Sequence, residues 1–329
     1  MPGKEDERLR AALYETTGTA RAVLRVDDTD RPEPGPGQVR VKVSLSGVNP
    51  TDVKSRAGLT PRPIDGFQVP HQDGTGVIDA VGDGVAPERI GERVWLWMAA
   101  VGKWGTAAEW SVVPAEQAVR LPDPASDGLG ACLGVPAMTA HRCLFADGPL
   151  DGAAVLVAGG AGAVGHFAIQ LARRAGARVA TTVSSPEKAE LARAAGADLV
   201  VNYRDADALS RLRDFSGVMD RIVEVNLPAN LDLDLALSGP STAVVTYAAT
   251  ADDPTLPVRR CMSANVTLRF ILLYGVPRPA LLTAARDVTA AVAAGDLTEL
   301  PLRFFPLRDV VAAHEAVEAG AVGKVVVEP

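Results

Sequence analysis

The chain has 329 residues, of which 47% are hydrophobic and 22% are charged, and it carries a formal net charge of −7. This length suits one or two globular domains, and the acidic balance argues against a surface that binds nucleic acid. No run approaches the roughly 20 apolar residues of a membrane span, and the polar start MPGKEDERLR lacks the core of a signal peptide. Cys132, Cys143 and Cys261 are odd in number and scattered, which is typical of a reducing compartment. We therefore expect a cytoplasmic globular protein with a loose leader at residues 1–8.

The first third of the chain is rich in short predicted strands. Branched or alternating apolar residues recur between turn clusters, and the proline–glycine segment RPEPGPG at 31–37 is a connector. The pattern indicates a barrel-like lobe of antiparallel strands. The predicted strands are 11–14, 39–45, 76–81, 94–98, 107–113 and 119–122.

From about residue 124 the pattern changes to short apolar strands that alternate with helices. Such alternation predicts a doubly wound parallel sheet, so the fold class is α/β. After residue 277 we expect a helix near 280–294, a strand near 303–306, a helix at 307–319 and a last strand at 324–327 that returns to the first lobe. The predicted parallel strands are 155–158, 178–182, 199–201, 221–225, 243–247 and 266–273.

A glycine cluster follows the first parallel strand. Residues 153–176 read AAVLVAGGAGAVGHFAIQLARRAG, in which Gly160-x-Gly162-x-x-Gly165 separates a buried strand from a helix with one apolar face. A dinucleotide needs such a turn, because its pyrophosphate must approach the backbone closely and face a helix N-terminus. The sequence therefore predicts a dinucleotide site, and the alternative is a tight turn that binds nothing.

The end of the second parallel strand indicates which dinucleotide binds. An Asp or Glu usually ends this strand and binds the ribose 2′-hydroxyl, but here Ser184, Ser185 and Pro186 follow the strand without one. The serine hydroxyls and the ammonium group of Lys188 would hold a 2′-phosphate, which favours NADP over NAD. No arginine lies in the turn itself. The serines also suit a helix start before Pro186, and both roles can coexist.

From about Arg10 to Val327 the sequence resembles the zinc-independent quinone oxidoreductase (zeta-crystallin-like) branch of the medium-chain dehydrogenase/reductases. The resemblance rests on several motifs in the family's order. They are SGVNPTDVKSRAG at 46–58, PHQDGTGVIDAV at 70–81, GERV at 91–94, GTAAE at 105–109, VPAMTAH at 135–141, the glycine turn, VNY at 201–203 and PLRDVVAAHEAVEAGAVGKVVV at 306–327.

The resemblance implies a GroES-like β-barrel catalytic domain, residues 1–124 and 277–329, around a Rossmann domain, residues 125–276, with NADPH as cofactor. It also implies a role for each matching position. Ser184, Ser185, Lys188 and Tyr203 would surround the 2′-phosphate, Asn226 and Tyr247 would line the ribose and nicotinamide, and Lys324 would approach the cofactor. Thr139, Gly159, Gly160, Gly162, Ala163, Val164 and Gly165 would contact the nicotinamide half and the pyrophosphate. Alternatively, Tyr203 only covers the sheet edge and Lys324 is a solvated charge.

Some relatives in this superfamily use zinc, which needs three protein ligands. In this chain the expected early cysteine is replaced within residues 46–48, and only His71 and Asp73 remain in the next motif. Two candidate ligands without a thiolate make a poor site, and no CxxC pair exists for a structural zinc. We therefore expect no metal, and interpret His71, His141, His166 and His314 as structural.

A conjugated acceptor suits hydride transfer without a Lewis acid, because hydrogen-bond donors can stabilise the charge that arrives on its oxygen. The run Asn49-Pro50-Thr51-Asp52-Val53-Lys54 resembles the NPxDxK pattern of enone reductases. Asn49 would orient the substrate or the nicotinamide ribose, and Lys54 would donate a proton or hydrogen bond. Asp52 and Lys54 could share a face if the backbone is extended. The alternative is a surface loop with Asp52 as an N-cap.

The main functional hypothesis is an NADPH-dependent reductase of quinones or α,β-unsaturated ketones. One alternative is an enoyl-thioester or 2-alkenal reductase, for which Arg56, Arg62 and Lys103 are the only loop cations that could meet a thioester's phosphate. The other is an NADPH-binding protein without significant turnover, because a fold and a cofactor site do not guarantee chemistry. The apolar strand at 266–273 predicts a homodimer, since pairing it with its twin would cover an exposed edge.

Overall fold

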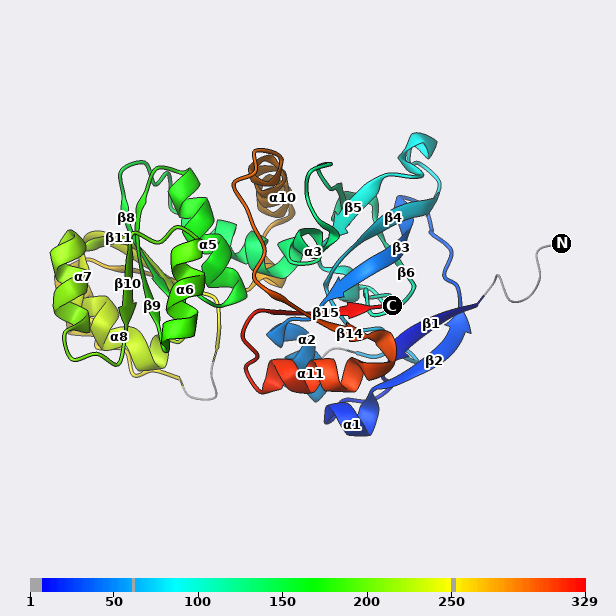
Figure 1. The fold of residues 1–329 in the computed structure, drawn as a ribbon, viewed down its shortest axis with the longest axis horizontal. Helices are drawn as coiled ribbons and strands as arrows, with labels where there is room; N and C mark the ends of the chain where they lie inside the picture. Colours follow the sequence, from blue (N-terminus) through cyan, green and yellow to red (C-terminus); the bar gives the residue numbers. More distant parts are fainter. Residues whose placement is uncertain (1–7, 61–62, 250–252) are drawn as a thin grey trace. The chain divides into compact units, whose positions relative to one another are not determined.

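The computed structural model describes residues 8–60, 63–249 and 253–329 (Figure 1). The chain divides into two compact units: unit 1 comprises Met1–Val135 with Pro301–Pro329, and unit 2 comprises Pro136–Leu300. The leader expected at residues 1–8 lies outside the described residues except for Arg8, which begins the first strand. No helix in the described part of the chain has the length and apolar character needed to cross a membrane.

Unit 1 is built on a seven-stranded sheet in the order β14-β15-β3-β4-β5-β7, with β6 also paired to β3. Strands β1 and β2 form a separate antiparallel pair. The C-terminal strand β15 pairs with β3 through Val326 and Gly47, which confirms that the end of the chain returns to the first lobe. The strands are β1 Arg8–Leu13, β2 Arg25–Asp30, β3 Gln38–Gly47, β4 Asp73–Val81, β5 Arg93–Leu96, β6 Trp110–Pro114, β7 Ala118–Arg120, β14 Leu302–Pro306 and β15 Lys324–Glu328; the helices are α1 Ala20–Val23, α2 Pro50–Ala57, α3 Asp127–Gly130 and α11 Val310–Glu318.

Two large apolar clusters stabilise unit 1, beside a smaller one around Tyr14, Ala20 and Leu24. One lies within the sheet and is formed by alternating side chains such as Val39, Val41 and Ile78. The other brings Leu9 near the N-terminus together with Val325 and Val327 of β15 and with residues of α11. Because the second cluster draws on both ends of the chain, unit 1 folds from two segments that are distant in sequence.

Unit 2 contains the predicted six-stranded parallel sheet, and its strands lie in the order β10-β9-β8-β11-β12-β13. The central strand β8 is buried along its whole length, which explains its unbroken apolar sequence. Figure 1 shows α5 and α6 beside this sheet. The strands are β8 Ala154–Ala158, β9 Arg178–Val183, β10 Leu199–Asn202, β11 Met219–Glu224, β12 Ser238–Thr246 and β13 Thr267–Phe270; the helices are α4 Met138–Phe145, α5 Ala163–Arg174, α6 Pro186–Ala194, α7 Ala208–Ser216, α8 Leu227–Ala236, α9 Val258–Ala264 and α10 Arg278–Ala293.

The two units divide the chain at different residues from the predicted domains, which were 1–124 with 277–329, and 125–276. Helix α10 accounts for much of this difference, because it packs against α4 inside unit 2. The contact includes His141 of α4, whose Nε2 lies 3.1 Å from a carboxylate oxygen of Asp287 on α10. An amphipathic pattern identifies the buried face of a helix but not the partner that covers it.

Candidate functional site

The glycine turn of unit 2 lies between β8 and α5. A Cβ atom at Gly160 would overlap the hydroxyl of Thr181 on the next strand, and one at Gly165 would overlap the carbonyl oxygen of Gly159. Gly162 is the N-cap of α5, and a Cβ there would meet only the Gly159 oxygen, at 3.4 Å. The first N–H groups of a helix have no partner within it and attract an anion. The turn therefore fits the pyrophosphate of a dinucleotide.

Two cations meet at the serine that follows β9. The ammonium group of Lys188 donates to the Ser184 hydroxyl at 3.2 Å, and the guanidinium group of Arg204 donates to the Ser184 carbonyl oxygen at 3.1 Å. The Arg204 side chain also lies over the ring of Tyr203, 5.4 Å from its centre. Ser185 has the predicted structural role, because its hydroxyl accepts from the backbone N–H of Lys188 as the N-cap of α6. The cluster fits a phosphate group.

Arg204 was missed in the sequence, where we looked for an arginine only in the turn after β9. It follows β10, and the sheet brings this strand beside β9, with Asn202 level with Val183. The VNY motif, which ends at Tyr203, could have pointed to Arg204. Tyr203 was a predicted phosphate contact, and Arg204 is the next residue in the sequence.

The ends of the next two strands, β11 and β12, also lie together. The backbone N–H of Tyr247 donates to the carbonyl oxygen of Glu224 at 3.3 Å. The Glu224 carboxylate accepts from the backbone of Asn226 and, at 2.9 Å, from the side chain of Asn230. Burial raises the pKa of Glu224 and that of Tyr247. Asn226 and Tyr247 thus follow the carboxyl ends of parallel strands, where such sheets bind ligands, while Thr139 is buried on α4.

Unit 1 holds Asn49 and Lys324, two of the predicted site residues, in a buried hydrogen-bonded cluster. The ammonium group of Lys324 donates to the side-chain oxygen of Asn49 at 2.6 Å, and the Asn49 amide nitrogen donates to Asp73 at 2.8 Å. The other Asp73 oxygen accepts from the backbone N–H of Val135 at 2.7 Å. Burial raises the pKa of Asp73, and the nearby Lys324 ammonium opposes that shift. Lys324 is only 4% exposed, so the alternative that it is a solvated charge was wrong.

Asp52 lies in the first turn of α2, behind the N-cap Asn49 and Pro50. One carboxylate oxygen accepts from the Asn49 backbone N–H at 2.8 Å, and the other has no hydrogen-bond partner among the described residues. Burial and the negative charge of Asp73 raise the pKa of Asp52 to about 7. The alternative of a surface loop capped by Asp52 was therefore wrong.

The same helix separates Asp52 from Lys54. We expected the two side chains to share a face if the backbone were extended, but residues 50–57 are helical. Neighbours two positions apart on a helix point to different sides. Asp52 is buried and Lys54 is half-buried, so the two side chains lie in different surroundings.

Beside this cluster, two histidines share a hydrogen bond. His71 Nε2 lies 3.0 Å from His314 Nε2, and His71 Nδ1 lies 2.8 Å from the Ser46 hydroxyl. Burial lowers the pKa of His71 well below its usual range and that of His314 to about 3, so both rings are neutral at neutral pH. In residues 8–60, 63–249 and 253–329 no group of three or more His, Cys, Asp or Glu side chains is arranged to hold a metal ion.

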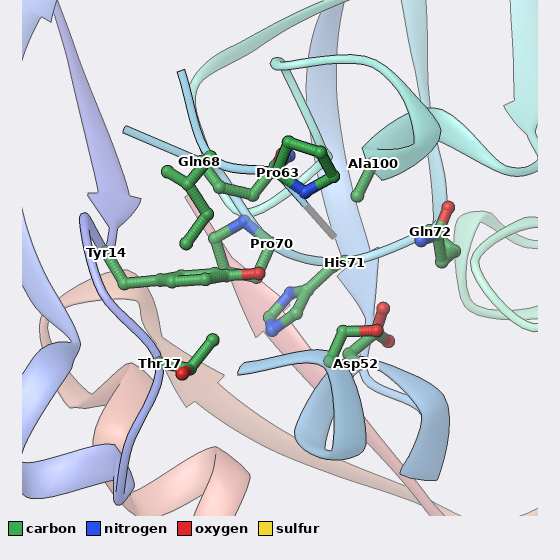
Figure 2. A pocket seen from close by; sticks show the side chains of 11 residues that line it. Tyr14, Thr17, Asp52, Pro63, Gln68, Pro70, His71, Gln72 and Ala100 are labelled. Atoms are coloured by element: carbon green, nitrogen blue, oxygen red, sulfur yellow. The ribbon is translucent and has the colours of Figure 1, made fainter. Parts of the chain in front are cut away.

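A small cavity of about 20 Å³ lies next to Asp52 and His71. In Figure 2 the ring of Tyr14 lies with its hydroxyl toward the His71 imidazole, and the Asp52 side chain lies on the other side of that imidazole. Gln72 closes another side. Unit 1 therefore places a titratable carboxyl group beside a small polar space.

Comparisons with known proteins agree with this geometry. Residues 35–123 match the family model described as "Alcohol dehydrogenase GroES-like domain", and residues 163–289 match "Zinc-binding dehydrogenase". A curated quinone oxidoreductase from Homo sapiens is 29% identical over 95% of both chains, and a 2-haloacrylate reductase from Burkholderia sp is 32% identical over 86% of this chain and 87% of that protein. A solved mycobacterial quinone oxidoreductase is 30% identical, with a TM-score of 0.85 over 98% of this chain and 100% of its own.

This chain belongs to the zinc-independent quinone oxidoreductase branch of the medium-chain dehydrogenase/reductases. Membership of the quinone oxidoreductase branch confirms the predicted GroES-like and Rossmann architecture, and confirms that the chain is an oxidoreductase. A second mycobacterial structure, complexed with NADPH, has the same TM-score of 0.85. In this chain the side chains of Lys188 and Arg204 bring two positive charges to Ser184.

Proposed function

We propose that the protein uses NADPH to reduce a quinone or an α,β-unsaturated carbonyl compound. The observation that carries the proposal is the convergence of Lys188 and Arg204 on Ser184, one strand away from the glycine turn. The relatives support it, since they include quinone oxidoreductases and a 2-haloacrylate reductase, whose named substrate is an electron-poor alkene. The mycobacterial relative complexed with NADPH supports the choice of cofactor.

The residues of unit 2 have separate tasks in this proposal. The backbone of residues 159–165 and the N-terminus of α5 bind the pyrophosphate. Ser184, Lys188, Arg204 and Tyr203 bind the 2′-phosphate, since a dianion is held best by charge-assisted hydrogen bonds. Thr139, Asn226 and Tyr247 contact the nicotinamide half. When bound, NADPH supplies the hydride for the reduction.

The residues of unit 1 act on the acceptor in this proposal. The Asn49 amide nitrogen donates to Asp73 and its oxygen accepts from Lys324. Both polar atoms of this side chain therefore have partners, and in this proposal Asn49 holds Lys324 and Asp73 in place and does not bind the acceptor. We therefore assign Lys324 to the acceptor side, as a positioning residue. Asp52 provides a carboxyl group whose pKa of about 7 lets it gain and lose a proton near neutral pH, and Lys54 provides a hydrogen-bond donor.

The structure disfavours the enoyl-thioester alternative. Arg56 is 1% exposed and donates to the Gly18 carbonyl oxygen and to Glu318, so it does not offer its charge to a thioester's phosphate. Lys103 lies over the ring of Phe67 at 4.2 Å. Arg62 lies outside the described residues. We expect a thioester to be a poorer substrate than a free enone.

We also propose a cytoplasmic homodimer joined through β13. This strand is at the edge of the unit 2 sheet. Phe270 is 66% exposed and Leu272, just beyond the strand, is 61% exposed. An apolar edge of this kind is an aggregation hazard unless another strand covers it. A second copy of β13 would extend the sheet across a two-fold axis.

The test follows the loss of NADPH absorbance with 1,4-benzoquinone, 9,10-phenanthrenequinone, an alkenone, a 2-alkenal and crotonyl-CoA, with NADH in parallel. We expect turnover of a quinone or an enone, faster with NADPH than with NADH. Lys188→Ala and Arg204→Ala should each raise the KM for NADPH by about tenfold or more, because each removes a charge-assisted bond of about 1.5–3 kcal/mol. The KM for NADH should change little.

The matched control is Arg193→Ala, which removes an exposed cation from the same helix as Lys188. Its kinetic constants should equal those of the wild type. If NADPH binds tightly but no acceptor is reduced, the protein without turnover becomes the better description. If Lys188→Ala and Arg204→Ala raise the KM for NADH as much as that for NADPH, the 2′-phosphate assignment is wrong.

A further inference from the structure

The cavity beside Asp52 reaches from the interior of unit 1 to its surface. Asp52, His71 and Gln72 line its buried part, whereas Thr17 and Pro63 on its other side are exposed. Figure 2 shows these side chains around one space, with Tyr14 and Ala100 between them. Solvent can therefore enter a space that ends at a buried carboxyl group.

Two residues that line the cavity each carry a side-chain oxygen without a partner among the described residues. Asp52 Oδ1 and Gln72 Oε1 have no hydrogen-bond partner among the described residues, although both side chains are only 3% exposed. A buried acceptor without a partner is costly. Gln72 Oε1 accepts hydrogen bonds, whereas Asp52 Oδ1 accepts when the carboxyl group is ionised and donates when it is protonated, so an occupant of this space must both donate and accept.

The size of the cavity decides what the occupant is. Its volume is about 20 Å³, and one water needs about 10–15 Å³ measured in the same way. The ring of a quinone is far larger than this space. One water can both donate and accept hydrogen bonds, as the two protonation states of the Asp52 carboxyl group require.

We propose that water in this cavity carries protons between solvent and the Asp52 carboxyl group, which serves as the proton reservoir of the reduction. The inference rests on the proposed function for the identity of the reaction. It assigns Asp52 a relay role, in addition to its role in the first turn of α2.

The protons and electrons balance as follows. The acceptor gains two electrons with the hydride, which forms one new bond and leaves an anion. Cavity water gives this anion a proton as one of its O–H bonds breaks, and the water takes a proton from the Asp52 carboxyl group. The resulting carboxylate regains a proton from solvent through the same water. NADPH is the reductant and the acceptor is the oxidant, so no other redox partner is needed.

Several titratable and charged groups face Asp52. Burial and the negative charge of Asp73 on β4 raise the pKa of Asp52 to about 7, and Lys324 of β15 opposes this shift. His71 stays neutral because its pKa is well below the usual range. From α11, which packs against α2, His314 is neutral for the same reason. The remaining charges on these two helices are Lys54, Arg56, Glu315 and Glu318.

The decisive variant is Asp52→Asn. Its side-chain oxygen can still accept from the Asn49 backbone, so the helix start is kept, but the side chain cannot titrate. We expect kcat to fall by about 100-fold, the lower end of what a positioned proton donor contributes. The break near pH 7 in the wild-type profile of kcat should disappear.

A second readout does not depend on turnover. Infrared difference spectra of the wild type should show a carboxylic acid band that grows as the pH falls through about 7 and that is absent from Asp52→Asn. This measurement needs neither NADPH nor an acceptor. If no acceptor is reduced but the band titrates, the proposed function fails while the water-linked carboxyl group stands.

Gln72→Met tests the water itself, because it removes one of the two unpartnered acceptors at nearly constant volume. We expect a smaller fall in kcat and a larger solvent deuterium isotope effect than in the wild type. The control is Asp127→Asn, which removes a carboxylate from the first turn of another helix of unit 1, α3. It should leave the pH profile and the isotope effect unchanged.

Three results would overturn the proposal. The first is a pH profile of Asp52→Asn that keeps the wild-type break. The second is the absence of a titrating carboxylic acid band that the variant lacks. The third is a Gln72→Met variant that is more stable than the wild type and has an unchanged isotope effect. If the cavity holds no water, removing an unpartnered buried oxygen should stabilise the protein.

Discussion

The Lys324 ammonium group donates a hydrogen bond of 2.6 Å to the side-chain oxygen of Asn49, although 275 residues separate the two in sequence. Lys324 Nζ also lies 3.6 Å from a carboxylate oxygen of Asp73. Strand β15 brings the lysine to the start of α2 by pairing with β3. The last strand of the chain therefore completes the polar cluster of unit 1.

Lys324→Met should destabilise the protein by about 3–5 kcal/mol, because removing one partner leaves the buried Asp73 carboxylate without its cation. Urea unfolding of the two proteins at neutral pH measures this difference. The control Lys103→Met removes a lysine that lies over Phe67 and should change stability by about 0.5 kcal/mol or less. A loss below about 1 kcal/mol for Lys324→Met would show that the buried pair contributes little.

Gly165→Ala should weaken both the fold and cofactor binding. The new methyl group would overlap the carbonyl oxygen of Gly159 and push α5 away from the turn. We expect a loss of stability of about 1–3 kcal/mol and a rise in the Kd for NADPH of tenfold or more. Thermal unfolding and fluorescence titration with NADPH measure the two effects.

Gly162→Ala is the matched variant for this turn. Gly162 has a φ of −79°, which alanine adopts readily, and its Cβ would meet the Gly159 oxygen at 3.4 Å. Stability should therefore change by about 0.5 kcal/mol or less, while the Kd for NADPH rises because the methyl group faces the pyrophosphate. If both variants bind NADPH like the wild type, the glycine turn is not the pyrophosphate site.

Stability should fall as the pH rises, because of Asp234 on α8. Neither of its carboxylate oxygens has a hydrogen-bond partner in the described part of the chain, and burial together with Glu224 raises its pKa to about 9. The folded state thus holds this proton more tightly than the unfolded state, whose pKa is 3.8. The stabilisation that the protonated Asp234 gives to the folded state is complete below about pH 4 and is lost as the pH rises through about 9.

Asp234→Asn should make the unfolding free energy less dependent on pH. Urea unfolding at about pH 5 and about pH 9 gives the two values to compare with the wild type. Asp232→Asn, an exposed position on the same helix, should keep the wild-type dependence. An equally steep fall in Asp234→Asn would assign the proton uptake to another group, such as Glu224.

Phe270→Lys should convert the proposed dimer to a monomer, because it places a charge on the exposed edge strand β13. Light scattering coupled to size-exclusion chromatography measures the mass of each species. Phe304 on β14 is the control, since it is also exposed on an edge strand but belongs to unit 1. Phe304→Lys should leave the dimer intact. A monomeric wild type would refute the proposed interface.

Short-range patterns in the sequence were sufficient to predict the parallel sheet of unit 2. The apolar run before Gly159 became β8, and the helical spacing after Gly162 became α5, which ends at Arg174 and is followed by Gly176 with a φ of 82°. Each of these features depends on neighbours within a few residues, such as turn geometry, capping and the period of apolar positions. The membership of the quinone oxidoreductase branch was also evident from the order of the motifs.

The tertiary structure decided which of the polar residues are buried and what they contact. The sequence alone showed Asp52, Asp73 and Lys324 as charged residues in separate motifs, and Lys324 could have been a solvated charge. Whether a carboxyl group keeps its usual pKa depends on desolvation and on charges brought near by distant strands. Arg204 reaches Ser184 only because β10 pairs with β9. Local sequence therefore determined the elements, whereas the charges of the site were decided by contacts that only the assembled sheets create.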